Sequence, residues 1–163
     1  MEYRLIIFDA DGTLRYCTVR GQPCPNRDGE WELYPGVAEK LSEFRWAPPG
    51  DGPGTGYGIA SNQGGVGVGY FSGETAMELL EDTFRQAFGF SPARGTVEIC
   101  PHAPRSGCDC RKPAAGMLVR LMDLYGVEPS EVLFVGDREA DRAAAENAGC
   151  DFQWAKDFFD RDS

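Results

Sequence analysis

Two pairs of aspartates stand where apolar runs of the chain end. Asp9 and Asp11 follow the first such run, and Asp137 and Asp141 follow the run at 132–135. Carboxylates held close together repel one another, so a cation is needed to keep them ionised, and hard oxygen ligands with room for water suit Mg²⁺. The pattern therefore predicts a magnesium site.

Hydroxyl, amide and cationic side chains follow two further apolar runs. Ser61 and Asn62 come after one of them, and Arg111 and Lys112 come after another run and its loop. A lysine beside a hydroxyl and free backbone amides suits an anion rich in oxygen. Carboxylates, Mg²⁺ and a lysine are together the groups that phosphoryl transfer uses.

The segments that must position these residues alternate between two periodicities. β-branched and apolar runs predict strands, and apolar residues at helical spacing predict helices between them, the clearest from Ser72 to Gly89. The strands are expected at 3–8, 57–60, 96–99, 132–135 and 150–154. Such alternation is typical of an α/β, Rossmann-like three-layer fold with a central parallel sheet. Because ligands collect at the carboxyl ends of parallel strands, the polar residues belong to one site.

The length of 163 residues fits one domain, so we expect a single domain over residues 1–163 without a large cap domain. Two stretches rich in proline and glycine, 15–34 and 47–56, are interpreted as surface loops. For the arginines of the first loop we expect a solvated surface, with contact to a second anionic group of a ligand as the alternative. These arginines are Arg15, Arg20 and Arg27.

The charge balance indicates the class of partner. Sixteen basic and 26 acidic side chains give a net charge of −10, which disfavours a phosphate backbone, so nucleic acid is an unlikely partner. The apolar runs are far shorter than the roughly 20 residues that span a bilayer, and the first is too short for a secretory signal. We expect a cytoplasmic monomer that acts on a small molecule and does not bind membranes.

A cluster of soft ligands lies just before Lys112. Cys100, His102, Cys108 and Cys110 supply three thiolates and one imidazole, which is the ligand set of a closed tetrahedral zinc site. The segment 100–110 is therefore interpreted as an inserted zinc loop. We expect a structural Zn²⁺ here, with catalysis left to Mg²⁺.

Four short motifs resemble those of the haloacid dehalogenase superfamily. They are Asp9-Ala10-Asp11-Gly12-Thr13, Ser61, Lys112-Pro113, and Gly136-Asp137 with Asp141, and the resemblance spans residues 5–150. The zinc loop followed by Arg111-Lys112-Pro113 looks like the zinc-containing histidinol-phosphate and heptose-bisphosphate phosphatases. Two departures are Ala10, where both kinds of phosphatase usually carry arginine, and Val68, where the heptose-bisphosphate phosphatases usually do.

The resemblance implies roles for the acidic residues. Asp9 is the expected nucleophile, which forms an aspartyl phosphate, and Asp11 protonates the leaving group and later activates water. Asp9, Asp137 and the backbone carbonyl of Asp11 would hold Mg²⁺, and Asp141 would support them.

The resemblance also implies which residues bind the substrate. Ser61, Asn62 and Lys112 would bind the phosphate, and Arg111 and Arg138 are candidate contacts to the rest of the substrate. The expected function is Mg²⁺-dependent hydrolysis of a small soluble phosphate ester, of the histidinol phosphate or sugar and heptose phosphate type. Two alternatives stay open: a polynucleotide 3′-phosphatase, and a catalytically silent binding module stabilised by zinc.

Overall fold

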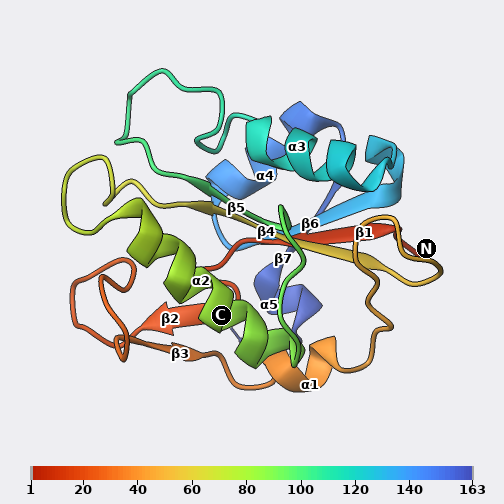
Figure 1. Cartoon of the computed structure of the whole chain (residues 1–163), viewed down its shortest axis with the longest axis horizontal. Coiled ribbons are helices and arrows are strands. Elements are labelled where there is room, and N and C mark those ends of the chain that lie inside the picture. Colours follow the sequence, from red (N-terminus) through yellow and green to blue (C-terminus); the bar gives the residue numbers. More distant parts are fainter. Residues whose placement is uncertain (1, 163) are drawn as a thin grey trace.

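The computed structural model describes residues 2–162, and its centre is a five-stranded parallel sheet with the strand order β5-β4-β1-β6-β7 (Figure 1). The strands are β1 (Leu5–Phe8), β4 (Gly56–Asn62), β5 (Val97–Cys100), β6 (Val132–Gly136) and β7 (Asp151–Trp154). The first strand lies in the middle of the sheet, where both faces are covered. This explains why all four of its residues are apolar and buried.

Helices cover both faces of the sheet, as Figure 1 shows. One face carries α1 (Val37–Leu41), α2 (Gly73–Phe88) and α5 (Ala155–Phe158), and the other carries α3 (Gly116–Tyr125) and α4 (Glu139–Ala148). A short 3₁₀ helix, η1 (Pro129–Glu131), leads into β6. Alternate residues of β1 serve the two cores: Ile6 and Phe8 pack toward α2, and Leu5 and Ile7 pack toward α3. The predicted three-layer α/β fold is confirmed.

The ends of α2 show how the sequence fixes an element. The Ser72 hydroxyl accepts a hydrogen bond from the Thr75 backbone N–H at 3.0 Å, and Gly89 ends the helix in the left-handed conformation with φ 87°. These are the cap residues that the sequence predicts. Between them, Leu80 and Phe84 are buried against the sheet.

The sequence suggested that the stretch 15–34 is a surface loop, but the structure shows that this is only partly correct. It contains an antiparallel pair of strands, β2 (Arg15–Cys17) and β3 (Trp31–Leu33). Each strand has three residues, which is too short to show an alternating pattern. This hairpin stands beside the end of β1 and covers part of the sheet's carboxyl edge (Figure 1).

Smaller differences concern element ends. The strand expected at 57–60 runs from Gly56 to Asn62, so Ser61 and Asn62 lie within its last residues. The C-terminal aromatic residues Phe158 and Phe159 are buried against Phe8 on the α2 face. No helix among residues 2–162 is both long and apolar enough to span a membrane, and this part of the chain has no large cap domain.

Candidate active site

The predicted site residues meet at the carboxyl edge of the sheet. β1, β4 and β6 are parallel, so the residues that follow them leave the sheet at the same end. Figure 1 shows the long connections after β4 and β5 and the β2–β3 hairpin gathered at that end. The site is therefore a product of the topology and is bordered by three loops.

Lys112 is the centre of the hydrogen-bond network at this edge. Its Nζ lies 2.7 Å from Asp9 Oδ1 and 2.8 Å from Asp141 Oδ1, and it donates to the Ala60 carbonyl at 2.9 Å. The three side chains are buried. Because an ammonium has three N–H groups, these partners fix the direction of the lysine.

The electrostatics of this group favour an additional cation. Burial raises the pKa of Asp9, and the neighbouring Asp141 and Asp137 raise it further, although Lys112 acts in the opposite direction. Burial also acts to lower the pKa of Lys112, but Asp9 and Asp141 outweigh it, so the pKa of the lysine is raised. One ammonium thus stands against several carboxylates, and a divalent cation would keep Asp9 ionised.

The carboxylates are spaced to share such a cation. One oxygen atom from each of Asp9, Asp137 and Asp141 lies within 4.8 Å of the others. Mg²⁺ binds oxygen ligands at about 2.1 Å, so its ligands are separated by roughly 3–4 Å. The donor set and its spacing fit Mg²⁺.

Asp137 lies close to the loop between β1 and β2, which contains Asp11 and Gly12. Gly12 has φ 90°, a conformation that L side chains rarely adopt, and a Cβ at this position would overlap the Asp137 carboxylate. The Thr13 hydroxyl is 3.4 Å from oxygens of both Asp9 and Asp137. Glycine is therefore required for the close approach of these two loops.

Asp11 is held by side chains that sequence reasoning did not assign to the site. Arg15 Nε donates to Asp11 Oδ1 at 2.7 Å and its Nη2 approaches Oδ2 at 3.3 Å, while Gln63 Nε2 donates to Oδ2 at 3.1 Å. Arg15 is 1% exposed, so the expectation of a solvated loop face is wrong for this residue. Arg20 is exposed, and Arg27 is an exposed partner of Glu30, as that expectation requires.

The end of β4 supplies the predicted phosphate-binding residues. Ser61 is buried, and its Oγ accepts a hydrogen bond from Gln63 Nε2 at 2.8 Å, which leaves the hydroxyl hydrogen for another acceptor. Asn62 exchanges hydrogen bonds with the Lys112 backbone, accepting at 2.9 Å and donating at 3.2 Å. The Asn62 side chain thus positions Lys112, and contact of Asn62 with phosphate stays a prediction.

A cavity of about 450 Å³ opens above these residues. Asp9, Asp11, Ser61, Lys112 and Asp141 are among its lining residues. Its wall also contains the two candidate substrate contacts, Arg111 and Arg138, and the apolar side chains of Pro23, Val68, Tyr70 and Pro104. Carboxylates and an ammonium are thus accessible to one small ligand.

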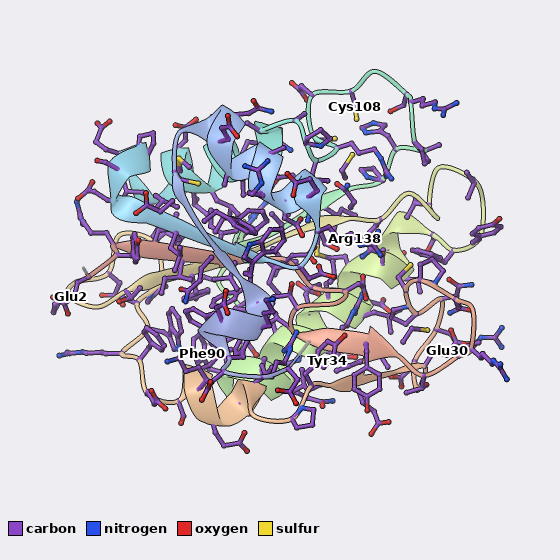
Figure 2. The ribbon with its side chains drawn as sticks, turned by 180° about the vertical axis from the view of Figure 1, so that it is seen from behind. Glu2, Glu30, Tyr34, Phe90, Cys108 and Arg138 are labelled. Carbon is purple, nitrogen blue, oxygen red and sulfur yellow. The ribbon has the colours of Figure 1, made fainter. Side chains whose placement is uncertain are left out.

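The four predicted zinc ligands are brought together. The Cys100 and Cys110 sulfurs are 2.8 Å apart, His102 Nδ1 is 3.1 Å from Cys110 Sγ, and Cys108 Sγ is 3.6 Å from Cys100 Sγ. All four ligand atoms lie within 4.8 Å of one another. Figure 2 shows Cys108 on its loop with further sulfur atoms beside it. The cluster suits tetrahedral zinc, whose bonds of about 2.0–2.3 Å place its ligands less than roughly 4 Å apart.

The zinc loop reaches the cavity through Pro104, and Arg111 and Lys112, which follow the loop, also line it. The zinc loop packs on the loop after β4 so closely that a Cβ on Gly67 would collide with the backbone of Ala103. The Arg111 guanidinium lies beside Gly64 and approaches the His102 carbonyl at 3.4 Å. Arg138, labelled in Figure 2, lies at the same end of the molecule as Cys108. The fold of the zinc loop therefore determines where Arg111 and Lys112 enter the site.

Comparison with known proteins agrees with this geometry. The chain is 31% identical over 154 residues to D-glycero-beta-D-manno-heptose-1,7-bisphosphate 7-phosphatase of Pseudomonas aeruginosa, covering 92% of this chain and 79% of the relative. The chain belongs to the haloacid dehalogenase superfamily of phosphatases. A model of the HAD-hydrolase-like family also matches residues 109–156.

Further comparisons place the chain within this superfamily. The crystal structure of D,D-heptose 1,7-bisphosphate phosphatase from Bordetella bronchiseptica, complexed with magnesium and phosphate, superposes with a TM-score of 0.70 at 30% identity. The alignment covers 93% of this chain and 79% of that one. The histidine biosynthesis bifunctional protein HisB of Actinobacillus pleuropneumoniae is 35% identical over 95 residues, which cover 56% of this chain and 25% of HisB. The chain thus lies in the subgroup of phosphatases that the zinc-loop motif indicates.

Proposed function

We propose that this haloacid dehalogenase phosphatase hydrolyses a small soluble phosphate ester of the sugar-phosphate type, with Mg²⁺ as cofactor and through an aspartyl phosphate on Asp9. The observation that carries the proposal is the contact of Lys112 with both Asp9 and Asp141 on the floor of the cavity. Asp11 lines the same cavity two residues along the chain. A nucleophile, a proton donor and a cation thus face one ligand.

The two carboxyl groups account for the chemistry. In the first step an Oδ atom of Asp9 forms a bond to phosphorus while the bond from phosphorus to the ester oxygen breaks, and Asp11 gives its proton to that oxygen. In the second step a water attacks phosphorus, Asp11 takes a proton from that water, and the bond between Asp9 and phosphorus breaks. Inorganic phosphate leaves, and both carboxyl groups return to their starting states.

The remaining residues bind and orient the phosphoryl group. Lys112 would neutralise its oxygens, and the free hydroxyl hydrogen of Ser61 would donate to one of them. Asp9, Asp137 and the backbone carbonyl of Asp11 would hold Mg²⁺, with Asp141 in support. When bound, Mg²⁺ supplies positive charge to the phosphoryl oxygens. The cluster around Cys110 would hold a structural Zn²⁺.

The leaving group would lie against the cavity wall. Arg111 and Arg138 line this wall and would contact a second anionic group or the hydroxyls of the substrate. The chain aligns over 92% of its length with a relative named for a heptose bisphosphate and over 56% with HisB, which favours a sugar phosphate over histidinol phosphate. Val68 lines the cavity where heptose phosphatases usually carry arginine, which argues for a smaller or less charged sugar.

The proposal is tested by phosphate release with Mg²⁺ across a panel of esters. The panel contains heptose and hexose mono- and bisphosphates, histidinol phosphate, nucleotides and 3′-phosphorylated oligonucleotides. We expect the fastest turnover with a sugar phosphate and none with Asp9→Asn. Turnover that survives in Asp9→Asn contradicts the proposed nucleophile.

The same panel distinguishes the alternatives. Fastest turnover of a 3′-phosphorylated oligonucleotide would indicate a polynucleotide 3′-phosphatase, against which the net charge of −10 argues. Absence of Mg²⁺-dependent release from every ester would indicate a silent binding module.

We further propose a monomer in the cytoplasm, where the six free cysteines would stay reduced. Gel filtration and localisation of a tagged protein test these two points.

A further inference from the structure

Arg15 is a buried arginine directly after the loop that carries Asp11, here called the catalytic loop (residues 9–14), and its partners lie in that loop and on α2. Its Nε and Nη2 face the two oxygens of Asp11, at 2.7 and 3.3 Å. Its Nη1 donates to the Thr83 hydroxyl at 2.9 Å and to the Leu79 carbonyl at 3.2 Å, both on α2. The guanidinium thus spans from the catalytic motif to a core helix.

A buried charge is retained at this position because its partners are complete. Moving an arginine out of water is strongly unfavourable unless its N–H groups are paired. Here Asp11 accepts from the guanidinium and neutralises its charge once it has given up its proton, and Thr83 and Leu79 accept from the remaining edge of the guanidinium. The Trp31 ring, 5.9 Å from the Arg15 Cζ, adds a contact from β3. These contacts leave the Arg15 side chain little conformational freedom, so the positions of the Nε and Nη2 atoms that face Asp11 are fixed.

We infer that Arg15 is the positioning residue for Asp11 in the reaction proposed above, and this inference rests on that proposed function. A two-point contact defines the plane of a carboxylate, whereas a single contact leaves it free to turn. Of the two Asp11 oxygens Gln63 contacts only Oδ2, so it cannot fix the plane of the carboxylate alone. Arg15 does not touch the reacting phosphoryl group in this role. It acts by holding the proton donor where the ester oxygen leaves.

The inference predicts that a variant of Arg15 loses catalytic rate to an extent that depends on the leaving group of the ester. Phenyl phosphate and 4-nitrophenyl phosphate have the same ring, but nitrophenolate departs readily without a proton, whereas phenolate depends on one. If Arg15 positions Asp11, a variant with a single-point contact should lose phenol release and keep nitrophenol release. The first turnover is the informative one, because hydrolysis of the aspartyl phosphate also uses Asp11 and is common to both esters.

The experiment compares Arg15→Lys with wild type by rapid quench, using both esters with Mg²⁺. We expect the first-turnover rate of phenyl phosphate to fall by about a hundredfold, with 4-nitrophenyl phosphate near the wild-type rate and KM for both nearly unchanged. Lysine keeps the buried charge but not the two-point geometry, so this variant is expected to fold. Arg15→Met is a second variant, which removes both the buried charge and the two-point contact with Asp11.

Matched controls separate positioning from general damage. Arg120→Lys alters another arginine–carboxylate pair, with Glu98 at 2.7 Å, outside the cavity, and is expected to keep wild-type kinetics. Thr83→Val removes the anchor on α2 and is expected to lower the melting temperature without selectivity between the esters. Equal losses on both esters in Arg15→Lys, a loss expressed in KM, or unchanged kinetics would overturn the inference.

The outcome also separates this inference from the proposed function. An active wild type with equal losses in Arg15→Lys refutes the role of Arg15 alone. A wild type that releases phosphate neither from these two esters nor from any ester of the panel above refutes the proposed function, and the positioning role of Arg15 with it. A crystal structure of Arg15→Lys provides a readout without turnover, and an Asp11 carboxylate in its original plane would contradict the inference.

Discussion

Lys112 Nζ lies 2.8 Å from Asp141 Oδ1, so an aspartate in the first turn of α4 fixes a lysine that comes from the loop after β5. The other oxygen of Asp141 accepts the backbone N–H groups of Asp137 and Arg138, each at 3.1 Å. One carboxylate thus joins the start of α4, a predicted Mg²⁺ ligand and the lysine that is proposed to bind phosphate. It is 2% exposed, so water cannot replace these contacts.

Asp141→Asn should therefore impair the site and leave the fold intact. The amide oxygen can still accept the two backbone N–H groups, but the amide nitrogen cannot accept from the Lys112 ammonium. Loss of a contact that orients the residues around a metal costs about 10–100-fold in metal affinity or activity. We expect a loss of that size in kcat/KM together with a higher Mg²⁺ requirement, measured by titrating Mg²⁺ at fixed substrate. Asp82→Asn, on the exposed side of α2, is the charge-matched control.

A second prediction concerns Arg161, near the end of the chain. Its two terminal nitrogens donate to the carbonyls of Thr13 and Gly12, each at 2.9 Å, and its Cζ lies 3.8 Å from the Tyr34 ring centre. The guanidinium thus fastens the catalytic loop to the C-terminal segment. We expect Arg161→Ala to lower the free energy of unfolding by about 2 kcal/mol, and to lower kcat because the loop that carries Asp11 is loosened.

Urea denaturation and steady-state kinetics measure these two effects. Arg142→Ala is the control, since Arg142 pairs with Glu139 and Glu146 on the surface of α4. Exposed pairs contribute about 0–1 kcal/mol. Equal destabilisation by the two substitutions would mean that the contacts of Arg161 with the catalytic loop add nothing beyond a surface ion pair.

The positions of the main catalytic candidates could be predicted because they depend on local sequence. Asp9 and Asp137 follow apolar strands, and parallel strands deliver such residues to one edge whatever the rest of the chain does. The spacing of Cys108 and Cys110 likewise predicts their place in a zinc site. The meeting of these residues then follows from the α/β alternation, whereas the order of the strands was not predicted.

The contacts of Arg15 with α2 and those of Arg161 with the loop after β1 could not be predicted in the same way, because these partners are distant in the sequence. Thr83 is 68 positions from Arg15, and the Thr13 carbonyl is 148 positions from Arg161. An arginine in a polar, glycine-rich stretch is usually solvated, and nothing in its neighbours shows that a helix will supply acceptors. Gln63 had a usable signal, since it stands two residues after Ser61 at a strand end and so points to the same side.

A third prediction concerns the zinc loop. We expect metal analysis to find about one Zn per chain, and chelation or Cys110→Ser to lower the melting temperature by roughly 2–4 °C for each kcal/mol of stability lost. The reason is that the loop 100–110 contributes few apolar side chains and would be fixed by the metal. Cys150→Ser, outside the cluster, is the control. A zinc-free protein with an unchanged melting temperature after chelation would contradict the interpretation.

The fourth prediction concerns alkaline pH and Tyr3. The Tyr3 hydroxyl donates to Asp151 Oδ2 at 2.6 Å, joining the segment that leads into β1 to the first residue of β7. This hydrogen bond, with burial second, raises the pKa of Tyr3 to about 12. An unfolded tyrosine has a pKa of about 10. The folded state therefore favours the neutral phenol.

The sign of the effect follows from the raised pKa. The contribution of Tyr3 to stability is complete below about pH 10 and is lost as the pH rises from about 10 to about 12, because the unfolded chain releases the proton first. Tyr3→Phe removes this contribution at all pH values, so the two proteins should differ in unfolding free energy at pH 8 and converge toward pH 12. Urea denaturation across this range measures the difference. A constant difference between the two proteins would show that Asp151 does not hold the Tyr3 proton.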